Sequence, residues 1–252
     1  MATTAQPSVE TVRTRLARVD DPELDESIVD LDYIESLTID ESKVTVTLVL
    51  PTAWCSPAFA WMMATGARDE LESLPRVATA TIRLEDHMHQ EEINRGVNER
   101  LEFEAVFEDA DDDIEVVRRT LAEKARMSRQ YRAIGALREA GLEDDQIVEL
   151  TRDAIDLGGE DEAGTDSDTI VVYLADGAFG VSVPAEPIIE YLQKATEVDI
   201  VTKPTDRVFA TAEADPIAPE ELDQIQHRAR LTGATVTGQG TICEGLNRAR
   251  NL

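Results

Sequence analysis

The strongest constraint on the fold is a β-strand pattern that is followed within a few residues by a helix start. Residues 43–50 alternate between two faces with a period of two, which is typical of a strand. Pro51 ends this strand, and Ser56-Pro57 begins a helix, because proline is favoured in the first turn of a helix. The helix is predicted over Ala58–Leu74. A strand and a helix that pack face to face predict an α+β fold.

The segments around this pair extend it into a small N-terminal domain. An amphipathic helix is predicted over Ser8–Val19, and two more strands are predicted over Ile34–Ile39 and Arg76–Leu84. The order of elements is then α-β-β-α-β. We assign this predicted domain to residues 1–92.

The next segment, residues 93–157, is predicted to be mainly helical. Its first part, Ile93–Asp113, is acidic and is expected to be irregular. Two helices are predicted after it, Ile114–Ala140 and Asp145–Leu157, and Gly141 is expected to close the first of them.

The C-terminal part begins after a stretch with almost nothing to bury. Residues 158–168 have the sequence GGEDEAGTDSD and are predicted to form a flexible acidic linker. Residues 169–252 are predicted to form a second α/β unit, whose role the sequence does not indicate. Its expected elements are a hairpin, a helix, two strands, a helix and a short strand: Thr169–Ala175, Phe179–Val183, Glu186–Thr196, Asp199–Thr202, Val208–Ala212, Pro219–Leu231 and Thr235–Gly238.

The charge of the chain predicts the environment in which it works. The sequence has 52 acidic residues against 24 basic ones, a formal net charge of −28. Such a chain repels itself at ordinary salt, whereas at molar salt the screening length falls to ~3 Å. Because the acids are spread along the whole chain, we interpret them as adaptation to a salty (halophilic) cytoplasm. An acidic surface that binds a partner is the alternative.

The hydrophobic segments and the cysteines agree with a cytoplasmic location. No apolar run approaches the ~20 residues that a membrane helix needs, so no membrane partner is expected. Met1–Val12 has no basic region followed by an apolar stretch, so no secretory signal is visible. The two cysteines lie far apart in the sequence, and a structural disulfide is not expected in this compartment.

Cys55 is the first candidate functional residue. It lies between the predicted strand and the predicted helix, directly before Ser56-Pro57. The N-terminus of a helix presents free N–H groups and the positive end of the helix dipole, which stabilise a thiolate. Cys55 therefore has the position of a nucleophile or metal ligand. The alternative is a small apolar side chain that only packs.

Several motifs in the same region occur in a defined order. Asp21-Pro22-Glu23 follows the first helix, Ser27–Leu31 has the sequence SIVDL, and Thr52 and Cys55 follow the second strand of the hairpin. In these motifs, residues 8–90 resemble the iron–sulfur cluster assembly factor family (PaaD/SufT-like, with a MIP-type domain).

The resemblance implies a function and a set of functional residues. It implies a factor that assists the assembly or delivery of iron–sulfur clusters or other metal centres. The implied cargo is an iron–sulfur cluster or iron, held transiently, with zinc as the alternative metal. The implied partners are a client metalloprotein or other assembly factors, and a homodimer is left open. The implied working residue is Cys55, supported in the motif by Asp21, Glu23, Asp30 and Thr52.

Two positions depart from the family pattern. The family has glycine where this chain has Asp32, and its cysteine is followed directly by proline, whereas Ser56 separates Cys55 from Pro57 here. The inserted serine either changes the direction of the thiol or leaves it unchanged.

A histidine pair forms the second candidate site. His87 and His89 follow the third predicted strand, and if that strand continues, they share one face because side chains alternate with a period of two. Two imidazoles and a nearby carboxylate suit Zn²⁺ or Fe²⁺. The end of this strand could lie beside the turn that carries Cys55. Surface histidines without a ligand are the alternative.

The second cysteine lies in a glycine-rich segment. Gly238–Gly245 contains Cys243 and lacks both the P-loop and the dinucleotide-binding patterns. A tight turn with a buried cysteine is one interpretation. A metal site shared with Cys55 is the other.

The helix predicted over Ile114–Ala140 is rich in basic residues, although the chain as a whole is strongly acidic. Residues 115–140 contain seven basic and three acidic residues. An amphipathic helix with internal ion pairs is one interpretation, and a docking face for an acidic partner protein is the other. Nucleic acid is not expected as a partner, because the next helix carries acids that would repel phosphate. The docking residues would be Arg118, Arg119, Arg126, Arg129 and Arg132.

Three functions therefore compete at the level of sequence. The first is an assembly or delivery factor that acts through Cys55. The second is a metal-dependent enzyme that uses Cys55, His87 and His89 around one ion with an open position for water. The third is a non-catalytic interaction adaptor with an inert cysteine.

Overall fold

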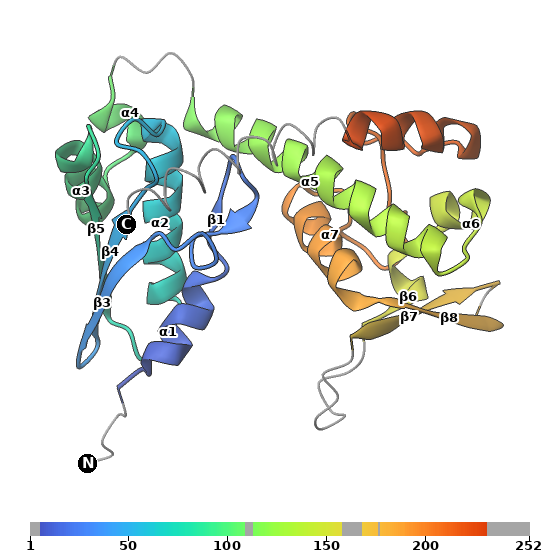
Figure 1. The fold of residues 1–252 in the computed structure, drawn as a ribbon, viewed down its shortest axis with the longest axis horizontal. Helices are drawn as coiled ribbons and strands as arrows, with labels where there is room; N and C mark the ends of the chain where they lie inside the picture. The colour runs from blue at the N-terminus through green and yellow to red at the C-terminus, as the bar shows by residue number, and fades with distance from the viewer. Residues whose placement is uncertain (1–5, 109–112, 158–167, 176, 231–252) are drawn as a thin grey trace. The chain divides into compact units, whose positions relative to one another are not determined.

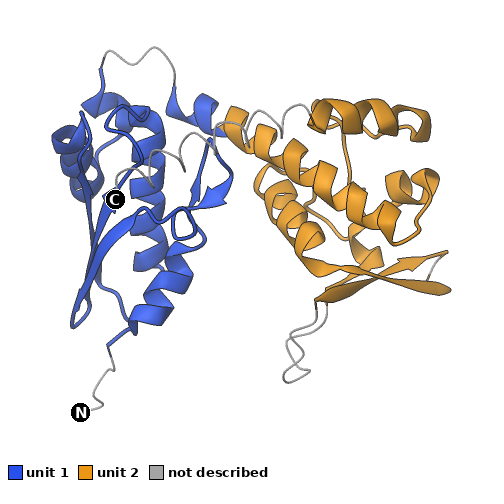
Figure 2. Cartoon of the chain, in the orientation of Figure 1, with its two compact units in different colours: residues 1–118, 236–252 blue, residues 119–235 orange. Residues whose placement is uncertain are grey.

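A computed structural model describes residues 6–108, 113–157, 168–175 and 177–230. The fold is α+β, as predicted from the sequence (Figure 1). The chain divides into two compact units, and the division falls within one long helix, between Arg118 and Arg119 (Figure 2). Each unit contains a three-stranded sheet and helices. The domain boundaries expected from the sequence remain predictions.

Unit 1 is built on the sheet β3-β4-β5. The strands β3 (Ile34–Asp40) and β4 (Lys43–Val49) form an antiparallel hairpin. The helix α2 (Pro57–Glu72) then crosses over, so that β5 (Thr79–Glu85) pairs with β4 in parallel. Figure 1 shows α2 beside this sheet. Val44, Val46 and Leu48 of β4 are buried on one face, as its period of two predicts, and the other face is buried too at Thr47 and Val49.

A short N-terminal helix and a small hairpin complete the core of unit 1. The helix α1 (Val9–Leu16) is capped by Ser8, whose side chain accepts a hydrogen bond from the Thr11 amide. It packs against α2. The two-residue strands β1 (Asp20–Asp21) and β2 (Glu26–Ser27) pair after it.

The segment after β5 is helical, so the expectation of an irregular stretch over Ile93–Asp113 is wrong for its first part. It forms α3 (Gln90–Glu99) and α4 (Phe103–Val106). The carboxamides of Asn94 and Asn98 each bond both the N–H and the C=O of a β5 residue, at 2.7–2.9 Å. These two side chains therefore satisfy an edge strand that would otherwise expose its backbone.

Unit 2 combines a long helix with a second antiparallel sheet. The helix α5 (Ile114–Glu139) runs without interruption through Gly135, and Gly141 follows it with a positive φ of 95°. The sheet order is β6-β7-β8. The remaining elements are α6 (Asp144–Glu149), the 3-10 helix η1 (Arg152–Ala154), β6 (Ile155–Asp156), β7 (Thr169–Leu174), β8 (Phe179–Pro184), α7 (Ala185–Glu197), the 3-10 helix η2 (Pro219–Glu221) and a helix over residues 222–230.

Two predictions for unit 2 are wrong in detail. The helix expected over Asp145–Leu157 ends at Glu149, because Leu150 turns away into an extended conformation and the following residues form η1 and β6. The strands expected over Asp199–Thr202 and Val208–Ala212 are not formed. Their apolar side chains enter the core of unit 2 from irregular segments, where Val201, Val208 and Phe209 are buried.

Some predictions fall on residues that the structure does not describe. These are the linker at 158–168, apart from Asp168, the strand Thr235–Gly238, and Cys243. Among the described residues, no helix is long and apolar enough to cross a membrane.

Candidate functional site

Cys55 lies in the loop that joins β4 to α2, within unit 1. Thr52 shapes this loop: its hydroxyl oxygen accepts a hydrogen bond from the Trp54 amide at 3.1 Å, and its carbonyl accepts one from the Cys55 amide at 3.4 Å. Cys55 is partly buried and is present as a thiol rather than in a disulfide. The neighbouring Trp54 is 76% exposed. The loop therefore presents its cysteine close to the surface.

The helix that follows Cys55 has an unusual N-terminus for this chain. Ser56 is its N-cap residue, yet its side chain makes no capping hydrogen bond, and Pro57 is the first helical residue. The first turn of α2 contains no acidic residue. Each of the other helices described with bounds has at least one acid in its first turn. The first turn of α2 thus has no acidic residue of its own at the positive end of the helix dipole, and the nearest ionisable side chain before it in the sequence is the Cys55 thiol.

A second loop lies against the Cys55 loop because β4 and β5 are parallel. Their register pairs Val49 with Glu85, so the loops after the two strands leave from the same edge of the sheet. His87 Nε2 lies 2.9 Å from the Cys55 carbonyl oxygen. The Met88 amide donates a hydrogen bond to the Ala53 carbonyl at 3.0 Å. The histidine loop and the cysteine loop are therefore joined directly.

Both ring nitrogens of His87 are used in this arrangement. Its Nδ1 accepts a hydrogen bond from the His89 amide at 3.1 Å, which places the ring proton on Nε2. Nε2 therefore donates to the Cys55 carbonyl oxygen. Burial lowers the pKa of His87 below its ordinary value, although the hydrogen bond to Cys55 acts in the opposite direction. The ring is accordingly neutral at pH 7.

His89 has a different environment. Asp86 has a positive φ of 55° and ends the strand, so the expectation that β5 continues and places both histidines on one face is wrong. The ring of His89 packs edge-on against Phe107, with 5.5 Å between ring centres, and lies 6.2 Å from the ring of His87. The two imidazoles are near each other without sharing a face.

The described residues contain no preformed metal site. No three His, Cys, Asp or Glu side chains among them converge so that they could hold an ion. The structure thus brings Cys55, His87 and His89 into one region, but it engages both nitrogens of His87 with backbone groups. An H-x-H pair predicts a ligand at His87 only as long as the backbone groups that its ring meets are unknown. Metal binding by these residues remains a prediction, as does a site shared with Cys243.

Asp21 has a structural role in the motif region. Its carboxylate is buried and accepts hydrogen bonds from the amides of Glu23 and Leu24 and from the Tyr33 hydroxyl, at 2.9, 3.2 and 3.2 Å. Burial raises the pKa of the Asp21 carboxyl, and these hydrogen bonds offset part of the effect. Glu23 is partly exposed and Asp30 is exposed. Asp21 therefore holds the turn after α1 against the rest of unit 1.

Asp32 explains how the chain accommodates the first departure from the family pattern. It has a positive φ of 56°. Its amide bonds the Val29 carbonyl and the next amide, of Tyr33, bonds the Ile28 carbonyl, at 3.2 and 3.0 Å. This pair of bonds is the Schellman arrangement, in which the left-handed position is usually glycine. The backbone at Asp32 therefore has a conformation that glycine favours.

The predicted arginine face of α5 is not a continuous exposed surface. Arg126 is fully buried and bonds Glu123, Gln130 and the carbonyls of Ala210 and Thr211. Two further arginines bond α7: Arg129 donates to the Glu190 carbonyl, and Arg132 pairs with the Glu190 carboxylate at 3.0 Å. The prediction of one docking face is thus wrong for Arg126 and Arg129, whose guanidinium groups pack into unit 2. Arg118 and Arg119 are exposed, and docking through them is a prediction.

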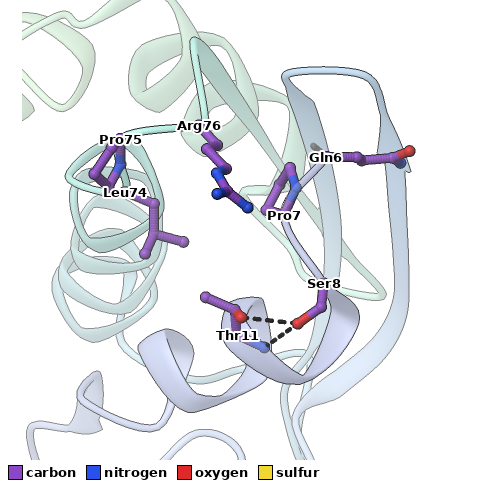
Figure 3. A pocket seen from close by; sticks show the side chains of 7 residues that line it. All are labelled: Gln6, Pro7, Ser8, Thr11, Leu74, Pro75 and Arg76. Carbon is purple, nitrogen blue, oxygen red and sulfur yellow. Dashed lines mark hydrogen bonds between the residues drawn. The ribbon is translucent and has the colours of Figure 1, made fainter. Parts of the chain in front are cut away.

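A pocket of about 280 Å³ lies elsewhere in unit 1 (Figure 3). It adjoins the start of α1 and the turn before β5, at the end of the sheet where β4 and β5 begin. Cys55 and His87 follow the opposite ends of these strands. The pocket contains no histidine, cysteine or acid, so we do not assign it to the candidate site. Its lining residues are Gln6, Pro7, Ser8, Thr11, Leu74, Pro75 and Arg76.

Comparison with known proteins gives one finding for this region. Residues 9–82 match the model of a family described as iron-sulfur cluster assembly protein. The matched segment contains Asp21 and Cys55 and ends before His87. No curated protein and no solved structure matches the chain.

Proposed function

Since residues 9–82 match the iron–sulfur cluster assembly protein family, we propose that the chain assembles or delivers iron–sulfur clusters and acts through Cys55. The observation that carries this proposal is the place of the thiol. Cys55 lies within the matched segment, near the surface, and directly before a helix whose first turn has no acid. Iron is bound by the thiolate form of cysteine, and the N-terminus of a helix is a position that stabilises thiolates.

The cluster is cargo in this proposal. Iron–sulfur clusters are typically held by four cysteine thiolates, and Cys55 supplies one. The remaining ligands come from elsewhere, and the candidates are Cys243, a client metalloprotein or another assembly factor. A single thiolate in an open loop suits transient holding and transfer better than permanent storage.

In this proposal His87 and His89 are neighbours of Cys55 and not ligands of a catalytic metal. An enzyme that uses Cys55, His87 and His89 around one ion would need a free nitrogen on each ring. His87 offers none in this conformation, because both its nitrogens bond backbone groups. We therefore place the chemistry on Cys55 and propose no metal-dependent reaction.

The setting of this function is proposed from the charge of the chain. A net charge of −28 distributed along the sequence fits a cytoplasm with molar salt, where self-repulsion is screened. Assembly and transfer should accordingly be measured at molar KCl.

Anaerobic reconstitution with iron and sulfide in molar KCl tests the proposed function. Wild type is expected to take up a cluster, detected by its visible absorption and by iron content, and Cys55→Ala is expected to lose it. Ser56→Ala is the matched control, because Ser56 is adjacent and its side chain makes no capping bond. Cys243→Ser reports whether the second cysteine contributes a ligand.

Two outcomes of the reconstitution would contradict the proposed function. If neither wild type nor Cys55→Ala takes up iron and sulfide, the chain does not hold a cluster itself, and the adaptor interpretation is favoured. If both variants take up the same amount, Cys55 is not the residue that holds the cargo.

A further inference from the structure

We propose that His87 is a positioning residue for Cys55: it fixes the cysteine at the N-terminus of α2 by donating a hydrogen bond to the Cys55 carbonyl oxygen. The inference rests on the proposed function only in taking Cys55 as the working residue. His87 lies outside the matched segment, and its role follows from the contacts that it makes in this fold.

The first argument is the direction of the hydrogen bonds. The His89 amide donates to Nδ1 at 3.1 Å, so that nitrogen carries no proton, and Nε2 becomes the donor to Cys55 at 2.9 Å. The imidazole thus links the backbone at His89 to the backbone at Cys55. His87 is only 5% exposed, so water competes little for these bonds.

The second argument is that the cysteine loop needs an anchor. The loop has no regular secondary structure between β4 and α2, and its largest side chain, Trp54, points to solvent at 76% exposure. The bonds to Thr52 are local and shape the turn. The bonds to His87 and Met88 link it to residues more than 30 positions away, after the neighbouring strand.

The third argument is the effect on the thiol. Cys55 immediately precedes the N-cap residue of α2, and a thiolate is stabilised only close to the first turn of a helix. A hydrogen bond on the Cys55 carbonyl restricts the backbone from which the side chain projects. Loss of this bond should let the thiol move away from the helix terminus and become less reactive.

Four variants in a Cys243→Ser background, where Cys55 is the sole thiol, test this role. The measured quantity is the rate constant of Cys55 alkylation by iodoacetamide at pH 7 in molar KCl, for the full chain. His87→Ala should slow alkylation by about two- to fivefold, the factor expected from losing a helix-terminus interaction. His89→Ala is the matched control and should leave the rate unchanged, because its backbone amide still donates to His87.

Two conservative variants separate the hydrogen bonds. In His87→Gln the side-chain amide can reach the Cys55 carbonyl, so the rate should return to near that of wild type. In His87→Asn the shorter side chain can still accept from the His89 amide but does not reach Cys55, so the rate should resemble that of His87→Ala. A purely structural role would instead make the rate follow the stability of each variant, measured by urea unfolding.

The inference is overturned if His87→Ala alkylates at the wild-type rate or faster, or if Gln and Asn behave alike. If His87→Ala does not fold, the difference in alkylation rate between His87→Gln and His87→Asn tests the inference. The assay contains no cluster, so it separates the two proposals. Failed iron–sulfur uptake with the expected alkylation pattern removes the proposed function and leaves the positioning role. Normal iron–sulfur uptake without the expected alkylation pattern removes the positioning role and leaves the proposed function.

Discussion

At the scale of single residues, Asp32 shows how a substitution can preserve a backbone conformation. The turn over residues 27–31 is followed by a left-handed residue, Asp32, at a position where glycine has no steric cost and aspartate has a modest one. The resemblance to the family implies glycine at this position, and the structure gives the reason in the two hydrogen bonds that close the turn.

The first prediction concerns this position. Asp32→Gly should be neutral or should stabilise unit 1 by up to ~1 kcal/mol, because it removes left-handed strain at the cost of a more flexible unfolded chain. Asp32→Val should destabilise it by about 1–3 kcal/mol, because a β-branched residue tolerates positive φ poorly. Urea unfolding followed by tryptophan fluorescence measures both, since Trp54 and Trp61 both lie in unit 1. Equal stability of the Gly and Val variants would contradict the assignment.

The candidate site could be predicted in part from single residues. The strand end, Ser56-Pro57 and the intervening cysteine are local signals, and they located Cys55 between β4 and α2. The histidine pair follows the end of β5, as its position in the sequence predicts. The function of His87 could not be predicted, because its hydrogen-bond partner is a backbone carbonyl 32 residues away.

At the scale of elements, the contact between α2 and α3 depends on a glycine. A Cβ atom at Gly96 would overlap the six-membered ring of Trp61 and approach Val106 at 2.9 Å. Trp61 also packs edge-on against Phe103 and Phe107, with 5.5 and 6.3 Å between ring centres. The ring therefore has little room to move, and α3 approaches α2 closely only because residue 96 has no side chain.

The second prediction compares two helical glycines. Gly96→Ala should destabilise unit 1, because overpacking costs about 1–3 kcal/mol and exceeds the gain in helix propensity of up to ~1 kcal/mol. Gly135→Ala in α5 should stabilise unit 2 by ~0.5–1 kcal/mol, because a Cβ there meets nothing within 4 Å. Tryptophan fluorescence measures the unfolding of the Gly96→Ala variant, and circular dichroism at 222 nm measures that of the Gly135→Ala variant. A Gly96→Ala variant as stable as wild type would contradict this prediction, because α2 and α3 would then accommodate the added methyl group without cost.

The helix α3 also shows why one element was missed. Its buried face consists of Ile93, Gly96 and Val97, which have helical spacing but span only about one turn and include a glycine, a residue that disfavours helix interiors. Asn94 and Asn98 also join α3 to the sheet, because they satisfy backbone groups at the edge of β5. A pattern of asparagines four residues apart could have indicated this role only once the position of β5 was known.

At the scale of the whole molecule, charge should control stability. The chain has a net charge of −28, and many acids have no basic residue to balance them, since acids outnumber bases by 52 to 24. Surface ion pairs such as Arg132–Glu190 contribute little individually. Repulsion among the remaining acids therefore affects stability more strongly than these pairs do at low salt.

The third prediction is a rise in the unfolding temperature with salt. Raising KCl from ~0.1 M to ~1 M shortens the screening length from ~10 Å to ~3 Å, which should remove most of the repulsion. Each kcal/mol of stability recovered should raise the midpoint by about 2–4 °C for a chain of this size. Calorimetry in KCl and in NaCl at equal ionic strength separates screening from ion-specific effects. A midpoint that stays constant or falls with salt would contradict adaptation to a salty cytoplasm.

The sequence by itself determined the elements whose signals are local. The hairpin β3-β4, the start of α2 at Ser56-Pro57 and the close of α5 at Gly141 depend on periodicity and caps that act within a few residues. Tertiary structure alone decided what depends on distant partners. The parallel register of β4 and β5 brings His87 to Cys55 across 32 residues, and Arg126 is buried by carbonyls more than 80 residues away.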